Sequence, residues 1–135
     1  MESLSSNNNV SIGAIAENDA CTFLVNHGLK LIEKNFSVTN AQGKSIGEID
    51  LIMRDKEFLV FIEVKKRGSE DYGDPIEMVT KQKQSKIIRT ATHYLVRNYS
   101  YYKEFCRFDV VGISPDTNEP GDQKFEWIKD AFQVQ

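Results

Sequence analysis

Three carboxylates and a lysine stand close together in this sequence and could act on a phosphate. They lie in the stretch GEIDLIMRDKEFLVFIEVKKR, residues 47–67, as Glu48, Asp50, Glu63 and Lys65. Carboxylates that share a poorly solvated position repel one another, and a divalent cation removes the conflict. Mg²⁺ prefers such hard oxygen ligands, and a neighbouring lysine could orient a nucleophile or stabilise negative charge on a phosphate. The spacing is therefore compatible with phosphodiester cleavage.

A charged protein surface is the alternative interpretation of the same residues. Glu-x-Lys on a strand usually forms a weak, solvated ion pair, and this is the simpler explanation of Glu63 and Lys65 taken alone. Asp50 and Glu48 count against it, because pairing with one lysine leaves their negative charge unbalanced. On the residues alone, a metal site and a charged surface both stay open.

Two predicted strands must position these side chains. Apolar runs predict strands over residues 48–54 and 58–66, with a turn centred on residues 55–56. This turn places Asp50 opposite Phe61 and, because side chains alternate along a strand, puts the charges on one face. Asp50 and Glu63 are then diagonal neighbours, with Cα atoms roughly 7–8 Å apart. The side chains predicted to share the face are Glu48, Asp50, Glu63 and Lys65.

The rest of the chain predicts one mixed α/β domain. Residues 1–10 are polar and low in complexity, which predicts a disordered tail, and residues 11–135 form a single domain. Its predicted elements are a helix over 11–27, strands over 29–38, 48–54 and 58–66, a helix over 75–98, and strands over 105–114 and 124–132. The second helix begins with Asp74 as N-cap and Pro75 at its first position. The order α-β-β-β-α-β-β predicts a mixed sheet flanked by helices.

Composition excludes several classes of protein. The 135 residues are 27% charged and 40% hydrophobic, as in an ordinary globular domain. Cys21 and Cys106 lack the spacing of zinc or redox motifs. No apolar run reaches the length of a membrane span. No signal peptide is recognisable, so the cytoplasm is the expected compartment. The net charge of −3 argues against a general nucleic-acid coat protein.

The second predicted helix carries charge of one sign. Residues 78–103 contain six basic and no acidic residues, so this segment is +6 and the rest of the chain is −9. A face of one sign can hold a phosphate backbone through salt-sensitive contacts, whereas an ordinary solvated face usually mixes signs. The residues predicted to contact nucleic acid are Lys66, Arg67, Gln82, Lys83, Lys86 and Arg89.

The same residues carry a family resemblance. Asp50 and, after twelve residues, Glu63-Val64-Lys65 resemble the PD-(D/E)xK nuclease motif without its proline. The strings NHG, GEIDLI, FIEVKKR, ATHYL and RFDVVGI, within residues 12–132, resemble the bacterial YraN family, which is related to archaeal Holliday junction resolvases. The resemblance implies a restriction-endonuclease-like core of the order α-β-β-β-α-β(-β).

The resemblance also implies roles for individual residues. Asp50 and Glu63 would bind Mg²⁺ or Mn²⁺ together with the Val64 carbonyl, and Lys65 would be the catalytic lysine. Glu17 stands where resolvase-like members carry a helix glutamate that joins the metal cluster; a solvated helix flank is the alternative.

Two further residues are assigned with alternatives open, and a third departs from the family pattern. Glu48 would be an outer metal ligand or only a charge at the sheet edge. Gln82 resembles the helix glutamine that some nucleases place beside the lysine, although an exposed helix residue explains it equally well. Lys66 stands where the family commonly has Thr or Ser, which would alter phosphate contacts and leave metal binding intact.

The leading hypothesis is a Mg²⁺- or Mn²⁺-dependent DNA endonuclease that acts on branched, junction or single-stranded DNA. A non-catalytic nucleic-acid-binding protein with a nuclease-like fold is the alternative, and a protein-interaction domain with a charged docking face is the third. A homodimer is expected by analogy with resolvases, and no association with membranes is expected.

Overall fold

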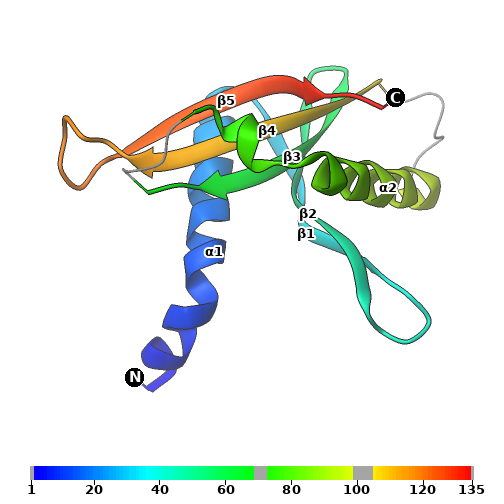
Figure 1. Cartoon of the computed structure of the whole chain (residues 1–135), viewed down its shortest axis with the longest axis horizontal. Helices are drawn as coiled ribbons and strands as arrows, with labels where there is room; N and C mark the ends of the chain where they lie inside the picture. Colours follow the sequence, from blue (N-terminus) through cyan, green and yellow to red (C-terminus); the bar gives the residue numbers. More distant parts are fainter. Residues whose placement is uncertain (1, 69–72, 99–104, 135) are drawn as a thin grey trace.

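The computed structural model describes residues 2–68, 73–98 and 105–134. The elements are α1 (Glu2–Asn26), β1 (Lys30–Thr39), β2 (Ser45–Asp55), β3 (Phe58–Lys66), the 3-10 helix η1 (Pro75–Met78), α2 (Lys81–Asn98), β4 (Phe105–Pro115) and β5 (Gln123–Phe132). The strands form one sheet in the order β1-β2-β3-β4-β5, in which β3 and β4 are parallel and the other neighbours antiparallel. The mixed α/β fold and its order α-β-β-β-α-β-β are confirmed (Figure 1).

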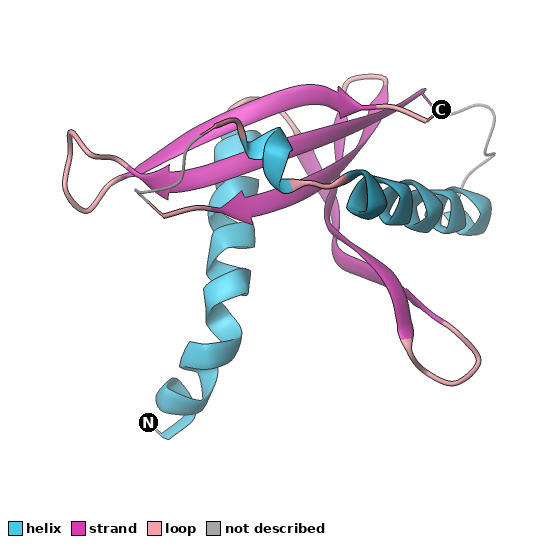
Figure 2. Cartoon of the chain, in the orientation of Figure 1, coloured by secondary structure: helices cyan, strands magenta, loops and turns pink. Residues whose placement is uncertain are grey.

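The helices cover opposite faces of the sheet (Figure 2). On one face, Ala16, Ala20 and Leu24 of α1 pack in a buried cluster with side chains of β2, β3 and β4. On the other face, Ile87 and Tyr94 of α2 pack in a second cluster. Because apolar side chains alternate between the two clusters, strands β2 to β4 are buried on both faces.

Helix α1 is longer than the sequence predicts. It begins at Glu2, whereas the apolar stripe predicts a start at Ser11. Its N-terminal part projects away from the sheet in Figure 1, and this part has no apolar stripe in the sequence. The disordered tail over residues 1–10 stays a prediction. The predicted stop at Gly28 is confirmed, because Gly28 has φ +99° and follows the last helical turn.

The predicted second helix is divided in two. A 3-10 helix begins at Pro75 with Asp74 as its N-cap residue, as predicted, but the predicted continuous α-helix over 75–98 is wrong. The 3-10 helix η1 is followed by the extended, buried Val79, and α2 begins only at Lys81. Asp74 makes no side-chain capping hydrogen bond. Thr80 caps α2 instead, because its Oγ1 accepts the backbone N–H of Lys83 at 3.1 Å. Burial of Val79 against α2 and its neighbours explains the interruption.

The register between β2 and β3 differs from the predicted one by two residues. Asp55 pairs with Phe58, so the turn consists of Lys56 and Glu57. Lys56 adopts φ +56°, the left-handed conformation that two-residue hairpin turns require. Ile52, not Asp50, therefore lies opposite Phe61. A shift of two residues preserves the facing of each side chain.

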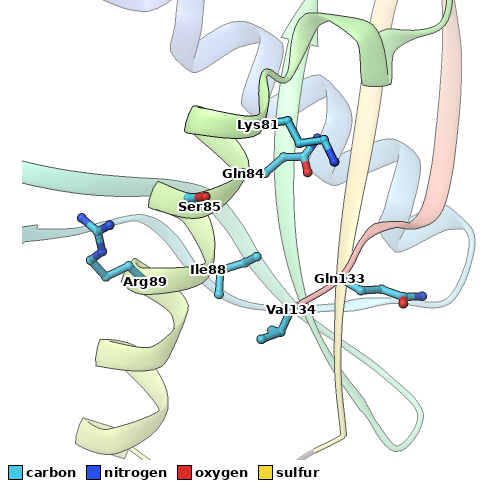
Figure 3. Close-up of a pocket in the computed structure, with 7 residues that line it drawn as sticks. All are labelled: Lys81, Gln84, Ser85, Ile88, Arg89, Gln133 and Val134. Carbon is cyan, nitrogen blue, oxygen red and sulfur yellow. The ribbon is translucent and has the colours of Figure 1, made fainter.

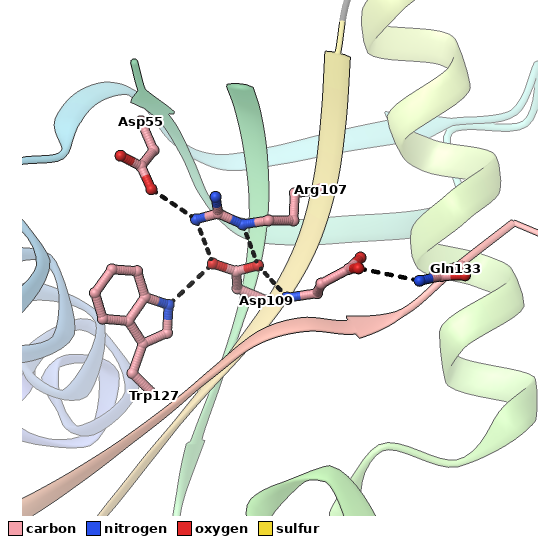
Figure 4. Close-up of polar contacts among 6 residues, drawn as sticks. Asp55, Arg107, Asp109, Trp127 and Gln133 are labelled. Carbon is pink, nitrogen blue, oxygen red and sulfur yellow. Dashed lines mark hydrogen bonds and ion pairs between the residues drawn. The ribbon is translucent and has the colours of Figure 1, made fainter. Parts of the chain in front are cut away.

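A buried polar network joins β4 to β5 (Figure 4). Asp109 has no solvent exposure. Its carboxylate accepts hydrogen bonds from the Arg107 guanidinium, the Trp127 indole at 2.9 Å and the backbone N–H of Asp130 at 2.9 Å. Arg107 also pairs with Asp55 at 2.9 Å. Asp109 thus has hydrogen-bond partners for both carboxylate oxygens and holds the network together.

None of the helices in the described parts of the chain has the length and apolar character needed to cross a membrane.

Candidate functional site

The predicted acidic residues lie where β2 and β3 separate. The ladder between these strands ends at the pair Leu51 and Ile62. One residue further, Asp50 Oδ2 accepts the backbone N–H of Val64 at 2.8 Å. A carboxylate thus replaces the strand partner at this point, and the strands part around it.

The four predicted charges do not lie on one face, so this part of the prediction is wrong. Ile49 and Ile52 both pack on the α2 side, while Leu51 packs on the α1 side. Residues three apart on a regular strand face opposite sides, so the alternation is interrupted beside Asp50. This interruption lets Asp50 interact with a helix residue on the α1 side.

Glu17 of α1 contacts Asp50. The two carboxyl groups are close enough for their contact to raise the pKa of Glu17. Burial, followed by the charge of Asp50, raises the pKa of Glu17 from its usual 4.5 to about 7, and the charge of Glu48 adds to this. A hydrogen bond from the Asn35 side chain opposes the rise. Glu17 therefore belongs to the acidic site, as the resemblance implies, and is not only a solvated helix flank.

Glu63 is almost completely buried and lies between two lysines. Its side chain is 6% exposed, and its Oε2 atom lies 3.4 Å from Lys65 Nζ and 3.8 Å from Lys83 Nζ. Burial and the charge of Asp50 raise the pKa of Glu63 from 4.5 to about 7, although both lysines oppose the rise. The site therefore holds more negative charge than its lysines compensate.

A pocket of about 230 Å³ opens at the acidic residues. It is lined by Ile12, Gly13, Ala16, Glu17, Asp50, Glu63, Val64 and Lys66. Three carboxylates thus meet one solvent-accessible space between α1 and the separating strands.

The donors at this pocket fit a hard divalent cation. In the described parts of the chain, no group of three or more Asp, Glu, His or Cys side chains is already arranged to hold a metal ion. Mg²⁺, however, usually needs only one or two carboxylates and keeps several waters. The paired carboxylates of Glu17 and Asp50 meet this requirement, with Glu63 and the Val64 carbonyl beside them. The raised pKa values indicate negative charge that a cation would neutralise.

The predicted nucleic-acid contacts are distributed differently from the prediction. Lys66, Gln82, Lys86 and Arg89 are exposed. Arg67 is buried instead: it donates to the Gly73 carbonyl and pairs with Glu126 at 2.7 Å. Its guanidinium therefore ties the end of β3 to Gly73 and to β5, and a phosphate would have to compete with Glu126 for it.

Helix α2 presents its cations in more than one direction. Lys83 faces Glu63, while Lys81 and Arg89 line a second pocket of about 350 Å³. Figure 3 shows this pocket, with Lys81 and Arg89 extending in opposite directions from it. Its lining residues are Lys81, Gln84, Ser85, Ile88, Arg89, Gln133 and Val134. The predicted basic face is thus divided between the acidic site and the opposite flank of α2.

Two contacts of the site, Lys83 with Glu63 and Asn35 with Glu17, escape prediction from the sequence. Lys83 is predicted from the sequence as a nucleic-acid contact, whereas its ion pair with Glu63 is not predicted. The dipeptide Lys-Gln occurs twice, at 81–82 and 83–84, so the sequence does not decide which pair faces the site. Asn35 stands in a run of strand-forming residues and carries no signal of a contact with Glu17.

Comparisons with known proteins identify the family. The model of the "Uncharacterised protein family UPF0102" matches residues 16–113. A UPF0102 protein of Nitrosococcus oceani is 44% identical over 123 residues, which cover 91% of this chain and 92% of the relative. A UPF0102 protein of Coxiella burnetii (strain RSA 493) is 44% identical over 124 residues, covering 92% and 93%. One of Clostridium botulinum (strain Kyoto) is 40% identical over 126 residues, covering 93% and 97%. The chain therefore belongs to the UPF0102 family, the YraN-like group that its motifs predict.

Proposed function

We propose that this protein is a divalent-cation-dependent DNA endonuclease that hydrolyses phosphodiester bonds, with branched or junction DNA as its substrate. The observation that carries the proposal is the pair Glu17–Asp50 next to the buried Glu63, whose carboxylate meets two lysines. Carboxyl groups with raised pKa values in an open pocket are more typical of a functional site than of a solvated surface. The resemblance to the PD-(D/E)xK motif and the element order of a restriction-endonuclease-like core support the same function.

The acidic residues would hold Mg²⁺ or Mn²⁺. Asp50 and Glu17 offer carboxylate oxygens, and Glu63 and the Val64 carbonyl lie next to them. Lewis-acid polarisation of the phosphate and neutralisation of its charge are what such a cation supplies when bound. Glu48 is exposed and influences Glu17 only through its charge, so it would act as an outer carboxylate.

The two lysines would act on the phosphate directly. Lys65 and Lys83 bring ammonium groups from a strand and from a helix to the same carboxylate oxygen. A phosphate placed there would accept charge-assisted hydrogen bonds from both. Because these donors are held by β3 and α2, they would need little rearrangement as charge develops on the phosphate. Lys65 would also orient the attacking water.

Exposed cations at the acidic pocket and on α2 would bind the nucleic-acid backbone. Lys66 lines the acidic pocket, and Lys86 and Arg89 are exposed on α2. Contacts of this kind hold phosphates irrespective of sequence and weaken as the salt concentration rises. Arg67 would contribute by holding the end of β3 in place, since it is already paired with Glu126.

A cleavage assay tests the proposal. Labelled four-way junctions, single strands and duplexes are incubated with Mg²⁺ or Mn²⁺ and with either the wild type or the double variant Asp50→Ala, Lys65→Ala. Cleavage of at least one substrate by the wild type, lost in the double variant and on adding a chelator, is the expected result. If no substrate is cut faster by the wild type than by the double variant, the enzyme proposal fails.

The exposed cations of α2 favour a second candidate function, a nucleic-acid-binding protein without catalysis. It predicts salt-dependent binding that survives Asp50→Ala and weakens when Lys86 and Arg89 are both replaced by Glu. Lys83 is a poor choice for this comparison, because reversing its charge would also repel the buried Glu63. Binding without cleavage, by a protein that retains its acidic site, would select this function.

A homodimer is part of the leading proposal, and sedimentation velocity tests it.

A further inference from the structure

An unusual backbone conformation lies directly beside the acidic site. Asn35 of β1 has φ +55°. The ladder pairs Lys34 with Leu51 and Phe36 with Ile49, so Asn35 lies opposite Asp50. Left-handed φ values are uncommon for residues other than glycine, and Asn adopts them more readily than most. Such conformations cluster at functional sites, where the surrounding structure maintains them.

The conformation of Asn35 changes the direction of its neighbours. Lys34 donates a hydrogen bond through Nζ to Asn18 Oδ1 of α1, whereas Phe36 packs on the α2 side of the sheet. Residues two apart on a regular strand lie on the same face. The left-handed residue between them therefore reverses the facing, at the position across from the interrupted alternation of β2.

This reversal produces two adjacent contacts between β1 and α1. Lys34 reaches Asn18, and the side chain of Asn35 hydrogen-bonds to Glu17. Because this contact lowers the pKa of Glu17, it favours the ionised carboxylate, which can only accept, so the Asn35 amide N–H is the donor. Asn35 is exposed, so its side chain makes little contribution to the core, and its conformation is best explained by the contact with Glu17.

We propose that Asn35 is a positioning residue that holds the Glu17 carboxylate next to Asp50 and thereby sets the affinity of the site for a divalent cation. The inference rests on the proposed function insofar as that function assigns a cation to these carboxylates. Residues that hydrogen-bond to a metal ligand fix its orientation, and their loss typically lowers metal affinity about 10- to 100-fold. No contact between Asn35 and the cation or substrate is required.

The experiment compares Mn²⁺ binding to the purified full-length protein and three variants by calorimetry at constant pH. Asn35→Gly tolerates the left-handed backbone and removes only the amide. Asn35→Ala also strains the backbone. Asn18→Ala is the matched control, because it removes the neighbouring contact between β1 and α1 and leaves Glu17 its donor. We expect about 10-fold weaker Mn²⁺ binding in both Asn35 variants, lower thermal stability in Asn35→Ala than in Asn35→Gly, and unchanged binding in Asn18→Ala.

Each outcome bears on the inference. An affinity of Asn35→Gly for Mn²⁺ equal to that of the wild type would overturn the inference. Equal losses of Mn²⁺ affinity in Asn35→Gly and Asn18→Ala would overturn it too, because they would indicate a purely structural link between β1 and α1. Absence of Mn²⁺ binding by the wild type would overturn it too. A wild type that binds Mn²⁺ in an Asn35-dependent manner and cuts no DNA would leave the inference standing and refute the nuclease function.

Discussion

Replacing Glu63 by Gln should stabilise the cation-free protein at alkaline pH. Burial and the charge of Asp50 raise the pKa of Glu63 from 4.5 to about 7 in the folded protein. The folded state therefore binds this proton more tightly than the unfolded state does. The resulting stability is fully present below pH 4.5 and is lost as the pH rises through about 7. A neutral amide at this position avoids the loss.

The size of the effect follows from the two pKa values. The rise from 4.5 to about 7, at about 1.4 kcal/mol per pH unit, amounts to roughly 3.5 kcal/mol as an upper limit. Glu63 is only 5% exposed, so solvent screening reduces this little. The new amide could still accept a hydrogen bond from Lys65, although both lysines lose a charged partner. We therefore expect Glu63→Gln to be more stable than the wild type by about 1–3 kcal/mol well above pH 7.

Urea denaturation in the presence of a chelator measures this difference. The wild type and Glu63→Gln are compared near pH 4.5, where the advantage should almost disappear, and at about pH 8.5, where it should be complete. Glu119→Gln, at an exposed position between β4 and β5, is the matched control, because it makes the same chemical change away from the site. A variant that is no more stable than the wild type at the higher pH would refute the claim that ionisation of the buried Glu63 destabilises the folded protein.

Three further predictions concern the site and its scaffold. Lys83→Ala should slow DNA cleavage about 10²-fold, because Lys83 lies beside Glu63. Lys86→Ala should mainly lower the salt dependence of DNA binding, by about one phosphate contact. Equal effects of the two substitutions would contradict a role for Lys83 in the chemistry. Asp109→Asn should lower the free energy of unfolding by about 3–5 kcal/mol, since it removes a fully buried charged partner of Arg107. An unchanged midpoint of urea denaturation would contradict a stabilising role for this polar network. Gly112→Ala should cost about 1–3 kcal/mol, because the added Cβ would lie 2.3 Å from Pro75 Cγ; a wild-type melting temperature would show that η1 can move away.

The strands and their order are predictable from the sequence because their apolar patterns are strong. Strand β3 has the predicted bounds Phe58–Lys66, since an apolar run and a polar turn define it locally. The register is less predictable, because it depends on which turn residue takes positive φ, and Lys56 is not a residue that favours it. The break before α2 likewise depends on the burial of Val79 by residues distant in the sequence.

The acidic residues of the site are predictable, but their geometry is not. Asp50, Glu63 and Lys65 come from the strand pattern, and Glu17 comes from the family resemblance. The structure brings all four to one pocket or its edge. Glu17 and Lys83 approach from opposite faces of the sheet because α1 and α2 cover opposite faces. The interrupted alternation of β2, which brings Asp50 to Glu17, is not encoded in the local sequence pattern.

The rate of DNA cleavage by the wild type and by Asp50→Asn, under single-turnover conditions with saturating Mn²⁺, tests the central claim most directly. Asn preserves the shape of Asp50 and its acceptance of the Val64 N–H, but it removes the charge that a divalent cation needs. We predict that the wild type cuts a labelled four-way junction and that the variant, still folded and still binding the DNA, is at least about 100-fold slower. Equal rates for the two proteins, or no cleavage by either, would contradict the account.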